Sequence, residues 1–285
     1  MADNSLEVKL EHFYKSRRGA GVLLEVTPKS AGWNYLSFRV IALKAGETYR
    51  EPSGGEEVAL VPLGGRATVD VSGARFEIAR DNLFAELPRV LYVPPGKTIA
   101  VTATHDFEFA AGGAPAQGRY PTRLFTPDEM KREVRGGGAA RRQVNHILAQ
   151  PLPAERLILY EVYVPGGMWS GWPPHRHDGG DSPYLEETYY YRFDADGGFG
   201  IQRNYRDETG FDELFTVKDG DVALVAQGYH PVACAPGANM YFLNYQAGDL
   251  LDAARATPPY DDPTQVWIKN DWNGRALPLP IGGKS

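Results

Sequence analysis

The sequence has little of the chemistry that secreted and membrane proteins use. Its 285 residues include a single cysteine, Cys234, so no disulfide can form within the chain, and a reducing compartment fits that composition. No apolar run is long enough to span a bilayer. Residues 1–9 lack the basic region and following apolar region of a secretory signal. We therefore expect a cytoplasmic protein that does not enter a membrane.

An excess of positive charge is also absent. The chain has 30 Lys and Arg against 36 Asp and Glu, a formal net charge of −6. A chain of this charge has no overall field that would attract nucleic acid or an anionic membrane. We therefore expect a small molecule as the partner, and the sequence leaves open whether the chain forms a homo-oligomer.

Turn-forming and aromatic residues, in contrast, are plentiful. The chain contains 32 glycines, 22 prolines, 16 tyrosines and 12 phenylalanines, a mixture typical of many short strands joined by tight turns. One short helix is predicted to begin at residues 126–129, where an N-cap Thr is followed by Pro and Glu. The chain is therefore predicted to be all-β. The strands predicted in the first half are residues 22–26, 35–43, 58–63, 67–71, 75–79 and 90–93.

Three of the six histidines fall in one pattern. His175 and His177 are two residues apart, which on a strand places both imidazoles on one face. Glu187 opens the next predicted strand, and His230 follows a later strand and turn. Three imidazoles and one carboxylate are a natural ligand set for a divalent first-row metal. By spacing alone Glu186, which faces the other side of the same strand, is an alternative to Glu187.

The two halves of the chain read as a weak repeat. Residues 35–47 parallel residues 156–168, and residues 90–98 parallel residues 222–230. In this register Glu57 corresponds to Glu187 and Thr98 to His230, and no histidine stands at residues 49–53. We therefore expect a degenerate first domain, residues 1–135, that binds no metal. The second domain, residues 136–285, carries the metal site, and the glycines at 136–138 with their basic neighbours form the connector.

Five motifs in one order resemble a known family. They are Pro-Gly-Gly-Met-Trp-Ser-Gly-Trp-Pro-Pro-His-Arg-His-Asp at 165–178, Leu-Glu-Glu-Thr-Tyr-Tyr at 185–190, Gly-Phe-Gly-Ile-Gln-Arg at 198–203, Gly-Tyr-His-Pro-Val at 228–232 and Tyr-Phe-Leu-Asn at 241–244. Together they resemble the 5-deoxy-glucuronate isomerases of inositol catabolism. The resemblance implies a bicupin, two tandem cupin barrels. It implies one metal per chain, zinc before manganese, iron or nickel, held by His175, His177, Glu187 and His230.

The resemblance also implies a reaction: the aldose–ketose isomerisation of 5-deoxy-D-glucuronate to 5-dehydro-2-deoxy-D-gluconate through an enediolate. Two functions from other classes stay open. An iron dioxygenase of the cupin superfamily could use the same three histidines and one glutamate, and its turnover would consume oxygen. A non-catalytic sugar-binding bicupin is the other alternative, although the second half keeps all four ligand residues.

Candidate residues for the remaining roles follow from position. Tyr191 shares the strand face of Glu187, and Tyr229 directly precedes His230, so these tyrosines are the predicted proton carriers. Arg203 is predicted to bind the substrate carboxylate through its planar guanidinium. Because strand residues alternate, Gln202 takes the place of Arg203 in the pocket if Arg203 faces outward.

Overall fold

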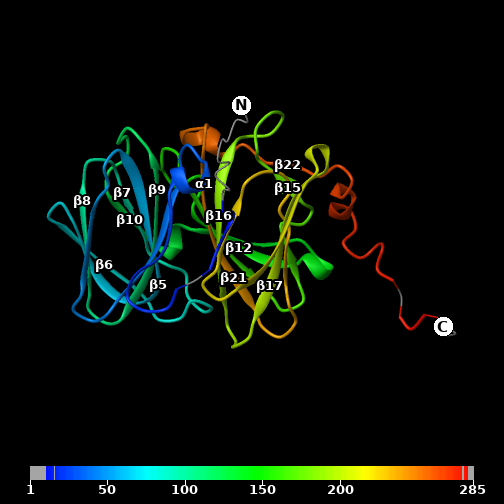
Figure 1. Ribbon diagram of the computed structural model, residues 1–285, viewed down its shortest axis with the longest axis horizontal. Helices are drawn as coiled ribbons and strands as arrows, with labels where there is room; N and C mark the ends of the chain where they lie inside the picture. Colours follow the sequence, from blue (N-terminus) through cyan, green and yellow to red (C-terminus); the bar gives the residue numbers. More distant parts are fainter. Residues whose placement is uncertain (1–10, 16, 278, 282–285) are drawn as a thin grey trace, which may run out of the picture.

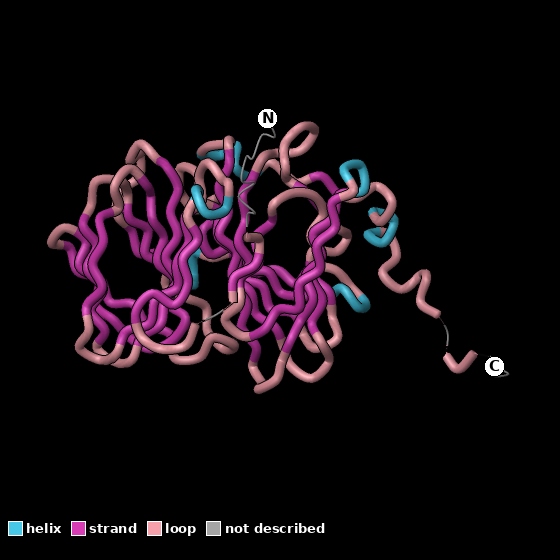
Figure 2. Tube along the Cα trace, in the orientation of Figure 1, coloured by secondary structure: helices cyan, strands magenta, loops and turns pink. Residues whose placement is uncertain are grey.

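The fold consists of two β-barrels that lie side by side (Figure 1). The computed structural model describes residues 11–15, 17–277 and 279–281. Strands from the first half of the chain form one barrel and strands from the second half form the other, and the helical turns of the described chain lie in the connections (Figure 2). The prediction of an all-β chain with two barrels is confirmed.

All strand pairs of the first barrel are antiparallel. Its strands are β2 (Gly21–Val26), β3 (Ser37–Leu43), β4 (Thr48–Pro52), β5 (Glu56–Val71), β6 (Ala74–Arg80), β7 (Val90–Val93), β8 (Thr98–Ala103), β9 (Phe107–Pro115) and β10 (Arg123–Phe125). They form a nine-stranded sheet whose main path runs β10-β7-β5-β9-β3-β2. Each of the six segments predicted as strands in this half overlaps one of these strands, and two of the segments fall in the same strand, β5.

Strand β5 is one strand where the sequence predicted two. It pairs with β7 and β9 at its start and with β6 and β8 at its end. The register against β9 shifts between Pro62 and Gly64, which is a β-bulge. Gly65 has a φ of 87°, and a Cβ there would lie 1.8 Å from the carbonyl oxygen of Asp106. The two glycines therefore bend a continuous strand and do not end it.

The second barrel is built from two larger sheets and a two-stranded pair. Its strands are β1 (Phe13–Tyr14), β11 (Lys131–Arg135), β12 (Arg142–Leu148), β13 (Ile158–Val164), β14 (Trp169–Ser170), β15 (His175–Arg176), β16 (Leu185–Phe193), β17 (Phe199–Arg206), β18 (Phe211–Lys218), β19 (Val222–Val225), β20 (Val232–Cys234), β21 (Met240–Gly248) and β22 (Tyr260–Asp261). The sheet orders are β1-β19-β16-β21-β13-β12-β11, β14-β20-β17-β18 and β15-β22.

The helical elements are short. They are the α-helix α1 (Pro28–Ala31) and the 3₁₀ turns η1 (Pro127–Glu129), η2 (Gly138–Ala140), η3 (Asp207–Thr209), η4 (Asp252–Ala256) and η5 (Val266–Lys269). The turn η1 is the helix start predicted from sequence, and Thr126 and Glu129 form its capping box. Among the described residues no helix is long and apolar enough to cross a membrane.

Two strands that precede the expected boundary at residues 135/136 pair with the second barrel. Strand β1 pairs with β19, and β11 pairs with β12. The last strand of the first barrel is β10, which pairs with β7. The chain therefore crosses between the barrels at η1, and the glycines at 136–138 lie inside the second barrel as the link from β11 to β12.

An apolar core lies between the barrels. One cluster of buried side chains draws its members from residues 24–130 and from residues 147–247. Phe38 packs edge-on against Tyr245, with ring centroids 5.2 Å apart. Gly112 makes this approach possible, because a Cβ there would lie 2.4 Å from the Tyr245 ring. A second cluster, drawn from residues 41–111, fills the interior of the first barrel with apolar side chains.

Two buried carboxylates hold the barrels together in the same way. Glu57 on β5 accepts hydrogen bonds from three consecutive backbone N–H groups at residues 155–157, at 2.6–2.8 Å. Glu186 on β16 accepts from the three N–H groups at residues 34–36, at 2.6–2.9 Å. Each carboxylate reaches the segment just before a strand of the other barrel, and this reciprocity is the structural trace of the repeat.

The repeat register predicted from sequence is wrong by one residue. Val58 lies opposite Val93, and Glu187 lies opposite Val225. Since Val93 and Val225 are equivalent in the repeat, Val58 takes the place of Glu187, and Glu57 takes the place of Glu186. The first barrel therefore has an apolar side chain where the second has its cavity-facing carboxylate.

We expect Glu57→Gln to lower the free energy of unfolding by about 3 kcal/mol or more, because hydrogen bonds to a charged group contribute about 1.5–3 kcal/mol each. The substitution removes the charge and turns an amide N–H₂ toward backbone donors. Urea unfolding followed by circular dichroism measures the change. The control is Glu77→Gln, an exposed strand residue of the same barrel, which we expect to change stability by less than about 0.5 kcal/mol. Equal stability of the two variants would contradict a stabilising role for the hydrogen bonds between Glu57 and residues 155–157.

Candidate metal centre and its cavity

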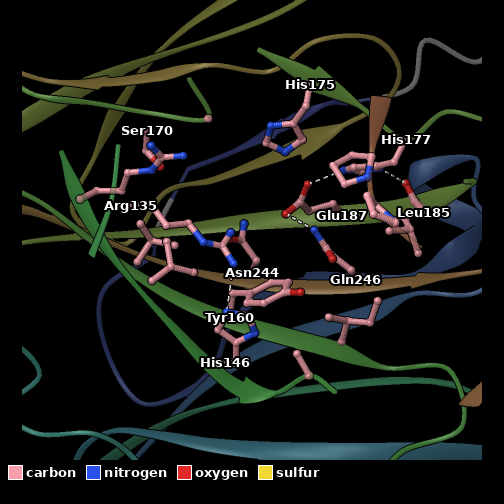
Figure 3. Close-up of a pocket in the computed structure, with 18 of the residues that line it drawn as sticks. Arg135, His146, Tyr160, Ser170, His175, His177, Leu185, Glu187, Asn244 and Gln246 are labelled. Carbon is pink, nitrogen blue, oxygen red and sulfur yellow. Dashed lines mark hydrogen bonds and ion pairs between the residues drawn. The ribbon is translucent and has the colours of Figure 1, made fainter. Parts of the chain in front are cut away.

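The four residues predicted as metal ligands come together in the second barrel. Figure 3 shows three of them, His175, His177 and Glu187. Glu187 Oε2 lies 2.9 Å from His177 Nε2 and 3.4 Å from His230 Nε2. The ring of His175 lies 4.7 Å from that of His230, centroid to centroid. Ligand atoms of His177, Glu187 and His230 all lie within 4.8 Å of one another, and His175 borders this group.

Backbone carbonyls orient the imidazoles. His177 Nδ1 lies 2.8 Å from the Leu185 carbonyl oxygen, and His230 Nδ1 lies 3.0 Å from that of Gly228. His175 has a backbone hydrogen-bond partner at Pro173. An imidazole that donates its Nδ1–H to a carbonyl presents an unprotonated Nε2, and this is the usual arrangement of a metal-binding histidine.

The donor set fits a divalent cation. His230 Nε2 is buried and makes no hydrogen bond, which is costly for a polar atom unless something else binds it. Glu187 is anchored at its other oxygen, where Gln246 Nε2 donates to Oε1 at 2.7 Å. Neutral imidazoles, a carboxylate and a partner that orients the carboxylate are the features of zinc and related metal sites.

The protonation states agree with this chemistry. Burial, and then the charge of the neighbouring histidines, lowers the pKa of His230 to about 3. Burial and the charge of His177 likewise lower the pKa of His175 to about 3. For His177 burial also favours the neutral form, but the hydrogen bond and charge of Glu187 outweigh it and raise the pKa. Two of the three imidazoles are thus neutral at physiological pH, the form that binds metal.

The cluster lies at one end of a cavity of about 650 Å³, a size that holds a small ligand. Four neighbouring strands contribute three alternate residues each, because every second side chain of a strand faces the same side. They are residues 142, 144 and 146 of β12, 158, 160 and 162 of β13, 185, 187 and 189 of β16, and 242, 244 and 246 of β21. Residues 255–259 of the C-terminal segment, together with Asp261, Lys269 and Trp272, contribute to another wall.

The predicted proton carriers do not line this cavity. Tyr191 faces the same side of β16 as Glu187, as predicted, but the four-stranded sheet covers it. Its hydroxyl donates to Gln202 Oε1 at 2.5 Å, and the side chain is fully buried. Tyr229 lies against Tyr205, with ring centroids 5.4 Å apart, and near Arg176.

The predicted carboxylate-binding residues also lie elsewhere. Arg203 faces outward on β17, where its Nε and Nη2 donate to Asp212 at 2.8 Å each. The alternation of β17 turns Gln202 inward, as the sequence argument allowed, but Gln202 is buried against Tyr191 and Asn204. Neither residue reaches the cavity.

Four functional candidates were missed from sequence. Arg135, Arg142, His146 and Tyr160 line the cavity, and Figure 3 shows Arg135, His146 and Tyr160 on the side away from His177. From sequence, the basic neighbours of residues 136–138 were placed in the connector, and His146 and Tyr160 were given no role in the site. The available signal was period two, since Arg142, Val144 and His146 on β12 and Ile158, Tyr160 and Val162 on β13 alternate with residues of the other face.

The chain matches a known protein family over most of its length. The KduI/IolB family profile matches residues 10–268. The chain belongs to the KduI/IolB family. A curated relative, the 5-deoxy-glucuronate isomerase of Geobacillus thermodenitrificans, is 41% identical over 254 residues, which cover 87% of this chain and 91% of the relative. The family and this relative make the chain an isomerase by class.

Solved structures agree with the assignment. An IolB-like protein from Salmonella typhimurium superposes with a TM-score of 0.86 at 37% identity, covering 91% of this chain and 99% of that one. Oxalate decarboxylase from Bacillus subtilis, a protein with Mn(II) centres, superposes with a TM-score of 0.56 at 15% identity. That match covers 84% of this chain and 78% of the oxalate decarboxylase chain. The second likeness concerns the fold alone, and it supports the predicted bicupin architecture.

We expect His177→Ala and His230→Ala to lose bound metal almost completely, because each removes a ligand from the buried cluster. Gln246→Leu should bind metal about 10–100-fold more weakly, the usual effect of removing the partner of a ligand. Metal content after equilibrium dialysis against Zn²⁺ or Mn²⁺, read by mass spectrometry, measures both effects. His105→Ala, on an exposed turn of the first barrel, is the matched control. Wild-type metal content in both ligand variants would refute the site.

Proposed function

We propose that the chain catalyses the aldose–ketose isomerisation of 5-deoxy-D-glucuronate to 5-dehydro-2-deoxy-D-gluconate in myo-inositol catabolism. The observation that carries the proposal is the buried cluster of His177, Glu187 and His230, bordered by His175, at the end of the cavity. The buried Nε2 of His230 makes no hydrogen bond to another described residue. The names of the curated relatives support the substrate. A buried lone thiol at Cys234 and the metabolic reaction support a cytoplasmic location.

One divalent metal per chain belongs to this proposal, with zinc ahead of manganese, iron and nickel. Its ligands are His175, His177, Glu187 and His230. A bound ion of this kind supplies Lewis-acid chemistry, because its charge offsets negative charge that develops on neighbouring substrate oxygens. Val58 stands where the first barrel would need a carboxylate, so the first barrel takes no part.

The protein's own groups handle the proton. In the reaction the carbon beside the aldehyde loses its proton, and its hydroxyl loses a proton as it becomes the ketone. The aldehyde carbon and the aldehyde oxygen each gain one proton, so no oxidant or reductant is needed. The register places Tyr189, Asn244, Tyr160 and His146 in one row across β16, β21, β13 and β12. This polar row runs across the floor of the cavity from the strand that carries Glu187.

Tyr160 is the proposed donor to the substrate oxygen. Its hydroxyl makes no hydrogen bond to another described residue, and its ring packs edge-on against His146 with centroids 5.0 Å apart. Burial raises the pKa of Tyr160, so the hydroxyl keeps its proton at neutral pH. A protonated phenol in the cavity donates to an oxygen that gains negative charge.

Isomerisation in deuterated water should place solvent deuterium on the new hydroxymethyl carbon of the product, because the transferred proton exchanges with solvent at an enediolate. Proton NMR of the product measures the label. Full turnover without label would point to a hydride shift and contradict the enediolate.

Protein stripped of metal by a chelator should lose turnover and regain it when Zn²⁺ or Mn²⁺ is returned. Full turnover without metal would contradict the metal role.

We expect Tyr160→Phe to lower kcat by about 10²-fold, the lower end of the range for loss of a proton-donating group, with little change in the melting temperature. Tyr49→Phe in the first barrel removes a hydroxyl that bonds to Glu51, and it serves as the control with unchanged kcat. An unchanged kcat in Tyr160→Phe would remove Tyr160 from the mechanism and leave the isomerase assignment standing.

A further inference from the structure

Among the described residues, one cation of the cavity has neither an acidic partner nor a full set of hydrogen-bond acceptors. Arg135 pairs with Glu133, whose carboxylate lies 2.6 Å from Arg135 Nη2. Lys269 pairs with Asp261. Arg255 donates to backbone carbonyls of Leu148, Leu152, Leu157 and Asp252. Arg142 makes one hydrogen bond between described residues, from Nη1 to the Ala140 carbonyl oxygen at 3.1 Å, and its buried Nε makes none.

This arrangement is costly without a ligand. Arg142 is half-buried, and a guanidinium that is partly removed from water with neither a carboxylate partner nor a full set of acceptors loses solvation without recovering it. Burial, and then the charge of Arg135, lowers the pKa of Arg142 to about 10. The side chain is nevertheless charged at neutral pH, so the cavity contains a fixed and unneutralised positive charge.

The turn between β11 and β12 shapes the space around this side chain. Gly136 has a φ of 73°, and a Cβ there would lie 2.7 Å from Arg142 Nη1 and 2.2 Å from the Ala140 carbonyl oxygen. A Cβ at Gly137 would lie 2.8 Å from the ring of Trp272, another cavity residue. The glycines thus allow the C-terminal segment and Arg142 to approach the same turn.

We propose that Arg142 binds the carboxylate of the substrate and makes the cavity selective for uronates over uncharged aldoses. This inference rests on the proposed function. The planar guanidinium presents parallel N–H donors that match a carboxylate, and a pair of charged hydrogen bonds formed away from water is strong. Arg203, the residue predicted from sequence for this role, already gives its two donors to Asp212.

The test compares 5-deoxy-glucuronate with 5-deoxy-glucose, in which a hydroxymethyl group replaces the carboxylate. In Arg142→Met we expect kcat/KM for the uronate to fall about 50-fold, which corresponds to the loss of a strong charged hydrogen bond, mostly through KM. For the uncharged aldose the change should stay below about threefold. Arg142→Lys keeps the positive charge but loses the pair of parallel N–H donors. Its kcat/KM for the uronate should therefore lie between that of Arg142→Met and that of wild type. Arg132→Met, an exposed arginine of β11, is the control.

A structural role for Arg142 predicts a different outcome. If Arg142 only supported the fold, Arg142→Met would melt at a lower temperature and lose both activities equally, and that result would overturn the proposal. We expect the melting temperature of Arg142→Met to match or exceed that of wild type, because the variant removes a half-buried charge that has no carboxylate partner among the described residues. Arg255→Met, which breaks several hydrogen bonds to carbonyls, should melt lower and marks the contrast.

Direct binding separates this proposal from the isomerase assignment. Calorimetric titration with D-gluconate needs no turnover, and we expect wild type to bind it and Arg142→Met to bind at least about 50-fold more weakly. That loss of binding would support Arg142 as the carboxylate-binding residue even if wild type failed to isomerise the uronate. Equal binding by the two proteins, or no binding by wild type, would overturn the proposal. Inorganic phosphate binding more tightly than gluconate at Arg142 would assign the site to phosphorylated sugars and overturn it as well.

Discussion

The alternation of side chains along β16 connects the two barrels to the cavity. Glu186 faces the first barrel and accepts three backbone N–H groups there, while Glu187 faces the cavity and contacts His177 and Gln246. Consecutive strand residues point to opposite faces, so a slip of one residue would exchange the two carboxylates. The hydrogen bonds of Glu186 therefore stabilise the register on which the candidate metal centre depends.

The same sheet serves two purposes. On the face toward the first barrel its side chains are apolar or aromatic, such as Tyr190, Leu243 and Tyr245, and they join the shared core. On the other face the alternate residues line the cavity. Because the interior of the first barrel is filled by its own cluster, that barrel supports the sheet from behind. The degenerate half of the repeat thus has a structural role.

Charged side chains have different partners on the interface side and on the cavity side of the second barrel. At the interface Arg80 and Glu161 are both fully buried, and they meet at 2.5 Å, so each charge is compensated within the protein. In the cavity Arg142 has no such partner. A charge left unpaired in the free protein lowers stability but is available to a ligand, and functional sites commonly carry this kind of local cost.

Residue spacing was enough to predict the strands of the first half, because short-range periodicity governs which face a residue occupies. The two-barrel plan and the grouping of His175, His177, Glu187 and His230 followed from the resemblance to a known family. Residue spacing did not predict which other side chains line the cavity. Tyr191 faces the predicted side, yet a second sheet covers it, and Arg203 faces solvent beside Asp212. Which side of a strand meets a cavity depends on what packs there, and spacing along one strand does not contain that information.

The sequence by itself determined the predicted donors of the candidate metal centre. Residue type and spacing, which are local properties, singled out the three histidines with Glu186 or Glu187, and the resemblance to a known family selected Glu187. Tertiary structure decided which other residues share their space. Strands β12 and β13 join β16 only through β21, so Arg142, His146 and Tyr160 reach the cavity through pairings between segments far apart in the chain. The repeat register was settled in the same way, because a one-residue offset between Glu57 and Glu187 is visible only in the pairing of strands.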